Sequence, residues 1–277
     1  MPWRTFNVGT LRVPGLSFAS TARDATGAPA MICRSLLVDL DDGYALVDTG
    51  FSPEDVTSRG RTLGRAFMTL VNPVLDPAEL LTAQLEQLGV RPEEVRHVLM
   101  THLDVDHAGG LVCLPEATVH VHAAELEAAT SRARAADRLR YYEHHFAHGP
   151  RWQAFSDAPD RWQGLPCGPL TGLPDGIRFV ELPGHSPGHC GFLFDGEGGR
   201  LGLHAGDAFL EVAELVGPSR RTSLAARLHH AAADHDSKLG RTTRARLADA
   251  IASHGPGLTV WNAHDPAHVV DGAVTFG

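Results

Sequence analysis

The sequence is poor in cysteine and has no long apolar run. Only 4 of its 277 residues are cysteines, and no two of them form a Cys-x-x-Cys pair. A chain of this length does not depend on disulfide bonds, so we interpret the thiols as free, mostly buried groups in a reducing compartment. No apolar stretch approaches the roughly 20 residues that a helix needs to cross a bilayer, so we expect no membrane association. The cysteines are Cys33, Cys113, Cys167 and Cys190.

Positive charge is also scarce. The formal net charge is −9 and there is no basic run, which argues against nucleic acid as a main partner. Residues 1–5 lack a basic region followed by an apolar run, so we expect no signal peptide and a cytoplasmic location. The expected partner is a small molecule. The sequence leaves the oligomeric state open, a homodimer included.

The composition is otherwise that of an ordinary globular protein, with one exception. The chain is 43% hydrophobic and 21% charged, and its 277 residues suffice for one large domain or two small ones. The exception is histidine, which occurs 17 times. Histidine is the commonest metal ligand in proteins, so this excess weakly favours a metalloprotein.

Four potential metal ligands lie within six residues, in the stretch 101–110. They follow a predicted buried strand at 95–100 and precede the close-packed turn Ala108-Gly109-Gly110-Leu111. Their spacing matches neither one helix face nor one strand face, so it indicates an irregular loop that wraps around a point. A solvated polar loop is the alternative, but crowded carboxylates repel one another unless a cation neutralises them. The pattern therefore favours a metal site. The four residues are His102, Asp104, Asp106 and His107.

Several predicted strands end in a short loop that contains Asp or His. Because strand ends can converge on one edge of a sheet, we expect these side chains to lie together, and the helices between strands predict a layered α/β fold. The loops are 48–50, 102–107, 184–189, 205–207 and 262–265. The predicted strands are 5–13, 32–40, 44–47, 95–100, 118–122, 177–182, 190–194, 201–204 and 258–261. The predicted helices are 76–89, 123–147, 222–235 and 238–253, and the predicted loops include 19–30, an irregular segment at 51–75 and a long covering loop at 148–175.

Nearly the whole chain resembles the metallo-β-lactamase superfamily. The resemblance rests on five motifs in the family's order: Asp48-Thr49-Gly50, the stretch 102–110, Pro183-Gly184-His185, Gly206-Asp207 and Ala263-His264. It implies a single domain over 1–277 with a four-layer αββα sandwich, and a lid or insert at about 130–175. The ending of the 102–110 stretch and Gly184-His185-Ser186-Pro187-Gly188-His189 look most like the N-acyl homoserine lactone lactonases.

The resemblance also implies roles for individual residues. His102, Asp104 and His185 would bind a first metal, Asp106, His107 and His264 a second, and Asp207 would bridge both, with zinc as the expected metal. Asp48 would orient a ligand by hydrogen bonding, and His189 would support the site without ligating. Asp106 or Asp207 would accept a proton during turnover.

The chain departs from this pattern at two positions. Asp104 stands where the superfamily usually has histidine, and a carboxylate there suits iron or manganese better than an all-histidine site does. Leu210 stands where the lactonases have a tyrosine, so a lactonase is a neighbour and not an identification.

Three functions follow as hypotheses. The favoured one is a hydrolase that uses a metal-bound hydroxide on an ester-type bond, a lactone or carboxylic ester first, with thioesters and phosphoesters as alternatives. The second is a non-heme di-iron redox protein, which Asp104 suggests. The third, a binding module without chemistry, is disfavoured because all seven ligand positions carry coordinating side chains.

Overall fold

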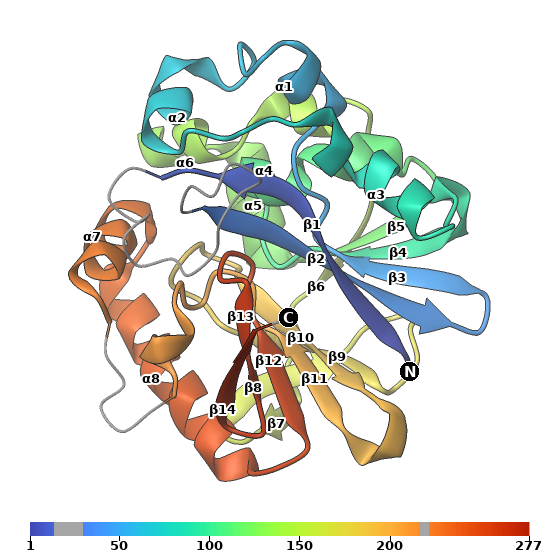
Figure 1. Cartoon of the computed structure of the whole chain (residues 1–277), viewed down its shortest axis with the longest axis vertical. Helices are drawn as coiled ribbons and strands as arrows, with labels where there is room; N and C mark the ends of the chain where they lie inside the picture. The colour runs from blue at the N-terminus through green and yellow to red at the C-terminus, as the bar shows by residue number, and fades with distance from the viewer. Residues whose placement is uncertain (14–29, 217–221, 277) are drawn as a thin grey trace.

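Two β-sheets packed face to face form the centre of the molecule, and helices cover their outer faces. The computed structural model describes residues 1–13, 30–216 and 222–276. Figure 1 shows α1 to α6 beside the first sheet and α8 along the second. The architecture is the predicted αββα sandwich. The loop predicted at 19–30 lies, apart from residue 30, outside the described residues.

The first sheet has six strands in the order β1-β2-β3-β4-β5-β6. β1, β2 and β3 pair antiparallel, whereas β3, β4, β5 and β6 run parallel. Parallel neighbours bring successive strand ends to the same edge of the sheet. The strands are β1 (Trp3–Leu11), β2 (Met31–Leu40), β3 (Gly43–Val47), β4 (Val95–Leu99), β5 (Thr118–His122) and β6 (Arg151–Phe155).

The second sheet has eight strands in the order β14-β13-β12-β11-β10-β9-β8-β7. Only β11 and β12 pair in parallel, and their ends carry the last two predicted site loops. The strands are β7 (Asp160–Trp162), β8 (Leu165–Pro169), β9 (Ile177–Glu181), β10 (Cys190–Asp195), β11 (Leu201–His204), β12 (Leu258–Trp261), β13 (Ala267–Val270) and β14 (Ala273–Phe276).

The helices are short except for the last. The α-helices are α1 (Pro53–Thr57), α2 (Gly64–Leu70), α3 (Leu81–Gln87), α4 (Val105–Ala108), α5 (Ala123–Ser131), α6 (Ala135–Arg140), α7 (Leu224–Ala233) and α8 (Ser237–His254). The 3-10 helices are η2 (Pro77–Glu79), η3 (Pro92–Glu94), η4 (Gly109–Cys113), η5 (Glu143–Phe146), η6 (Glu197–Gly199) and η7 (Val212–Glu214). No helix among the described residues combines the length and the apolar character that a membrane crossing needs.

Strand residues alternate between two buried layers. On β2, Leu36 and Val38 belong to the cluster between the sheets, whereas Leu37 belongs to the cluster under the helices. Successive side chains of a strand point to opposite faces, so a strand buried on both sides appears as a continuous apolar run. A third cluster joins the second sheet to α8 through residues such as Leu247 and Ile251.

Two predictions made from the sequence were wrong. The segment 148–175 is not one covering loop, because β6 extends the first sheet and β7 and β8 extend the second. Its Pro and Gly residues suggested a loop, but the sheets supply hydrogen-bonding partners for short strands. The predicted helix 123–147 is also interrupted: α5 ends at Arg132 in a left-handed conformation, and α6 and η5 follow. The strands β13 and β14 were not predicted.

The close-packed turn after His107 depends on glycine. Residues 107–110 lie against residues 49–52, with Thr49 N donating to the His107 carbonyl at 2.7 Å and Gly110 N donating to the Gly50 carbonyl at 3.0 Å. A Cβ on Gly109 would lie 2.5 Å from the Ser52 nitrogen, and one on Gly110 would overlap the Thr49 carbonyl oxygen. Backbone atoms cannot move aside as a flexible side chain can.

We therefore expect Gly110→Ala to lower the free energy of unfolding by about 1–3 kcal/mol, the usual cost of inserting an extra group into a close-packed site. Urea unfolding of the variant would measure the loss. Val112→Ala on the same 3-10 helix is the matched control, because Val112 is exposed. Equal stability of Gly110→Ala and wild type would show that the turn can open to admit a methyl group.

Candidate metal centre

The predicted strand-end loops meet at one edge of the sandwich. Asp48 follows β3, His102 follows β4, His185 follows β9, Asp207 follows β11 and His264 follows β12. All five side chains are at most 9% exposed. The convergence expected from strand order is therefore present in three dimensions.

One group of ligand atoms comes from His102, His185 and Asp207. These atoms lie within 4.8 Å of one another. Asp104 adjoins them, because its Oδ2 lies 3.1 Å from His185 Nε2 and 3.5 Å from His102 Nε2. The Nε2 of His102 is buried without a hydrogen-bonding partner in the described part of the chain. A buried, unsatisfied nitrogen costs free energy unless a further group binds it.

A second group comes from His107, Asp207 and His264, again within 4.8 Å. Asp106 adjoins it, since its Oδ2 lies 3.7 Å from His264 Nε2 and 3.8 Å from His107 Nε2. The buried atoms His107 Nε2 and Asp207 Oδ1 lie 3.5 Å apart, and neither has a hydrogen-bonding partner within residues 1–13, 30–216 and 222–276. Imidazole and carboxylate donors left unsatisfied around common points fit divalent metal ions.

Asp207 lies between the two groups. Its Oδ2 is 3.1 Å from His264 Nε2 and 3.6 Å from His185 Nε2, and its Oδ1 faces His107. His189 holds the backbone of Asp207 in place. The His189 Nδ1 donates to the Leu182 carbonyl at 2.8 Å, so its Nε2 accepts the Asp207 backbone N–H at 2.9 Å. His189 therefore holds the Asp207 backbone and cannot offer Nε2 to a metal.

Asp48 orients His107. Its backbone has a φ of 55° and its carboxylate accepts from Thr101 N at 2.9 Å and Thr101 Oγ1 at 2.7 Å. His107 Nδ1 lies 2.8 Å from Asp48 Oδ2 and donates to it, which turns His107 Nε2 toward the centre. Burial alone would raise the pKa of Asp48, but His107 outweighs it and the pKa is lowered.

In the metal-free centre, nearby carboxylates favour the protonated form of two histidines. Burial lowers the pKa of His107 and His264, but Asp207 and Asp106 outweigh it and raise the pKa of His107 to about 9 and that of His264 to about 10. Positive charge is therefore required wherever these carboxylates gather, whether protons or cations supply it.

Arg140, at the end of α6, was not identified from the sequence. Its Nε lies 3.3 Å from Asp104 Oδ1, and its terminal nitrogens donate to the His185 carbonyl at 2.5 Å and to the Ala233 carbonyl. Burial and Arg140 act in opposite directions on Asp104, and the net pKa lies well below the ordinary value. Arg140 thus offsets the charge that Asp104 adds. The sequence placed Arg140 only in the predicted helix 123–147 and in the expected lid or insert at about 130–175.

Glu125, on α5, joins the two ligand loops and was also missed. Its buried carboxylate accepts from Leu103 N at 3.0 Å, Ser186 Oγ at 2.6 Å, Gly188 N at 3.0 Å and Tyr141 Oη at 3.0 Å. Four donors from three segments therefore meet at one carboxylate. Nothing in the sequence distinguishes Glu125 from a solvated helix residue.

A pocket of about 410 Å³ opens beside the first group. Asp104 and Asp106 form its floor, while α6 and the segment between α7 and α8 form its walls. The lining combines apolar side chains (Phe67 and Leu139), cationic ones (Arg134 and Arg140) and further carboxylates (Asp137 and Asp234).

Comparisons with known proteins assign the chain to a family. Residues 28–254 match the family model of the metallo-beta-lactamase superfamily. A probable metallo-hydrolase of Mycobacterium tuberculosis is 37% identical over 238 residues, which are 86% of this chain and 76% of that protein. An N-acyl homoserine lactonase of Agrobacterium fabrum is 30% identical over 153 residues, which are 54% of this chain and 55% of that protein.

Solved structures share the fold. An N-acyl homoserine lactone hydrolase with its product N-hexanoyl-L-homoserine at the catalytic metal centre superposes with a TM-score of 0.72 and 19% identity, over 95% of this chain and 92% of that one. The matched family model and the mycobacterial relative cover most of the chain. The chain belongs to the metallo-β-lactamase superfamily and is a metallo-hydrolase of that fold.

Proposed function

We propose that the protein hydrolyses a lactone or a carboxylic ester at a centre of two divalent cations. The observation that carries this proposal is the position of Asp207, whose Oδ1 lies 3.5 Å from His107 Nε2 of the second group and whose Oδ2 lies 3.6 Å from His185 Nε2 of the first. A carboxylate so placed can bridge two cations. When bound, the cations supply an acidified water as nucleophile and polarise the carbonyl under attack.

The donor sets are assigned as follows. His102, Asp104 and His185 hold the first cation, Asp106, His107 and His264 hold the second, and Asp207 contacts both. Four of these seven ligands are histidines, and their nitrogen donors favour zinc. Pairing with Arg140 reduces the effect of the extra charge on Asp104, which supports zinc over iron or manganese.

Protons are handled by Asp106 and Asp207. The Asp106 carboxylate lines the pocket and is 12% exposed, so it can accept a proton and pass it to solvent. Asp207 is held by His189 through its backbone, which leaves both of its oxygens facing the centre. Asp48 keeps His107 in the tautomer whose Nε2 faces the centre.

The pocket supports an ester with an apolar group on one side. Phe67 and Leu139 offer apolar surface, while Arg134 offers a cation that suits the carboxylate formed by hydrolysis. The relatives named as N-acyl homoserine lactonases support a lactone. The contacts of the leaving group would differ from those in the lactonases, which have a tyrosine at the position of Leu210. Leu210 is buried in the core. The hydroxyls of Tyr141 and Tyr142 donate elsewhere, to Glu125 and to the Leu63 carbonyl.

A di-iron redox centre is the second candidate, and the carboxylate of Asp104 is the observation that favours it. The two candidates differ in metal content and in activity. The decisive experiment is to quantify metals in protein produced without added zinc, then to assay lactones, aryl esters, thioesters and phosphodiesters. Two zinc ions and turnover of lactones or esters support the proposal, whereas bound iron without hydrolysis of any substrate overturns it.

Removal of the metals by a chelator should abolish hydrolysis and lower the melting temperature. The carboxylates at the sheet edge repel one another once the cations leave, and metal binding that depends on the folded site contributes to folding free energy. Calorimetry and rate measurements before and after chelation would show both losses, and added zinc should reverse them. Unchanged melting temperature and turnover after verified removal would refute the centre.

Asp207→Ala should reduce kcat/KM more than His189→Ala does. Asp207 would lose contact with both cations, whereas loss of His189 frees only the Asp207 backbone N–H. Losses from partners that orient ligands run about 10–100-fold, and loss of the bridging ligand should exceed that range. Measurements of kcat/KM and of metal content for both variants test this prediction. A larger loss of kcat/KM in His189→Ala than in Asp207→Ala would contradict it.

Asp104 and Arg140 should be energetically coupled. Each single variant, Asp104→Ala or Arg140→Met, leaves one largely buried charge unpaired, but the double variant leaves none. The double variant should therefore lose less unfolding free energy than the two single variants lose together. We expect a difference of about 0.5–3 kcal/mol, measured by urea unfolding. Arg138→Met is the control, since Arg138 is exposed on the same helix and should not couple. Additive effects at Arg140 would contradict charge compensation.

A further inference from the structure

Cys33 lies beside the second ligand group. It follows the start of β2, which is tied to the loop that carries His264: Ile32 N donates to the His264 carbonyl at 3.2 Å, and His264 Nδ1 donates to the Ile32 carbonyl at 2.8 Å. These bonds hold the Cys33 backbone near the imidazole. The Cys33 side chain is 2% exposed.

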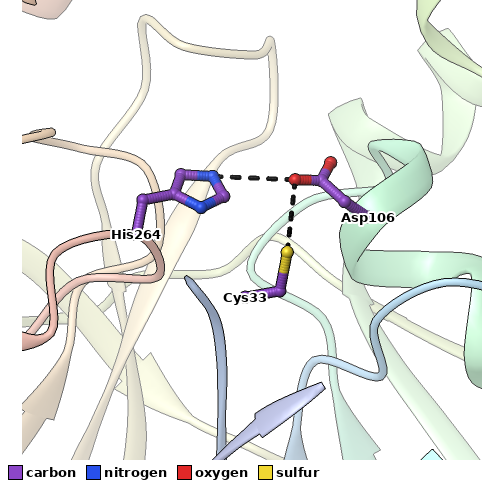
Figure 2. A group of neighbouring side chains, drawn as sticks. All are labelled: Cys33, Asp106 and His264. Carbon is purple, nitrogen blue, oxygen red and sulfur yellow. Dashed lines mark hydrogen bonds and ion pairs between the residues drawn. The ribbon is translucent and has the colours of Figure 1, made fainter. Parts of the chain in front are cut away.

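The thiol and the imidazole point at the same carboxylate oxygen. Figure 2 shows Cys33 Sγ and a ring nitrogen of His264 both directed at one oxygen of Asp106. Cys33 Sγ lies 3.8 Å and His264 Nε2 lies 3.7 Å from Asp106 Oδ2, and the three ligand atoms lie within 4.8 Å of one another.

These distances fit coordination of one cation. With a zinc–sulfur distance of about 2.3 Å and a zinc–oxygen distance of about 2.0–2.2 Å, angles of about 90–110° at a four- or five-coordinate cation place sulfur and oxygen roughly 3.1–3.7 Å apart. The observed separation of 3.8 Å between Cys33 Sγ and Asp106 Oδ2 needs little adjustment.

A separate observation points to a cation at this place. His107 is 1% exposed, and its Nε2 has no hydrogen-bonding partner among the described residues although it lies 3.8 Å from the same Asp106 Oδ2. His107 belongs to the group with Asp207 and His264, so it shares His264 with the group of Cys33. A buried imidazole nitrogen without a partner beside Asp106 Oδ2 fits a cation at this edge of the centre.

We propose that Cys33 is a ligand of the second metal ion, beside Asp106 and His264. This rests on the proposed metal centre. Binding of the divalent cation breaks the S–H bond, forms a sulfur–metal bond and releases one proton to solvent, with no change of oxidation state. The second site then contains a soft donor, and thiolate favours zinc, cadmium or cobalt over manganese or magnesium.

The two sites consequently differ in chemistry. The first contains the carboxylate of Asp104, paired with Arg140, and the second contains a thiolate. Soft cations therefore bind preferentially to the second site. The alternative is that Cys33 only donates a hydrogen bond to Asp106: burial and the nearby Asp106 raise the pKa of this thiol well above its ordinary value, so it is protonated when no metal is bound.

Cobalt spectroscopy separates these possibilities. Metal-free full-length protein is titrated with Co²⁺, bound cobalt is quantified, and the near-ultraviolet region is searched for thiolate-to-cobalt charge transfer. Wild type should show this band, and Cys33→Ala and Cys33→Ser should lose it while the visible d–d bands of cobalt bound elsewhere persist. Cys167→Ala is the matched control, because Cys167 is equally buried but belongs to the hydrophobic cluster between the second sheet and α8. It should retain the band.

The other outcomes contradict either the role of Cys33 or the metal centre itself. If cobalt binds to wild type without the charge-transfer band, or if the band persists in Cys33→Ala, Cys33 is not a ligand although the metal centre stands. If no cobalt or zinc binds, the centre itself is refuted and the inference with it. Thermal unfolding of both Cys33 variants checks that they fold, and X-ray absorption of the zinc protein gives a second measure through a sulfur neighbour at about 2.3 Å.

Discussion

Mutual repulsion of carboxylates at one edge of the sandwich is the constraint on which the site depends. Asp48, Asp104, Asp106 and Asp207 are brought together with little exposure to water, so each needs a positive partner. In the metal-free protein the partners are protonated histidines and Arg140. Bound cations would take the place of these protons, because the Nε2 atoms of His107 and His264 already face the centre. The same crowding makes the centre selective for positive charge.

Rigid supports make this crowding possible. The ligand loops follow strands of two different sheets, and backbone contacts at Gly109 and Gly110 press one of them against residues 49–52. Glu125 joins the loop after β4 to the loop after β9 through a single carboxylate. His189 holds the backbone of Asp207. The chain thus uses buried hydrogen bonds, and not metal alone, to keep its ligands in position.

Charge balance explains how a carboxylate is accommodated at position 104. A histidine there would be neutral, whereas Asp104 adds a negative charge close to His102 and His185. The positive charge of Arg140 offsets the negative charge of Asp104, so the net local charge resembles that of a site with a neutral histidine. Arg140 also donates to the His185 carbonyl. The departure from the family pattern is therefore local, because a residue on another helix compensates it. The pocket that results has cationic as well as apolar walls.

The sequence by itself determined the strand-end motifs, the order of the main strands and hence the layered fold, because those features depend on local spacing and on apolar periodicity. The resemblance also named the histidines and aspartates that the structure brings together in the two ligand groups, because their motifs are short and contiguous, but it did not name Cys33. It did not reveal β6 to β8 as strands, because their Pro and Gly residues suggest a loop and their partners are distant in sequence. Arg140 and Glu125 were decided only by tertiary structure: an arginine or a glutamate on a short helix looks solvated until folding buries it against a charge or a set of donors.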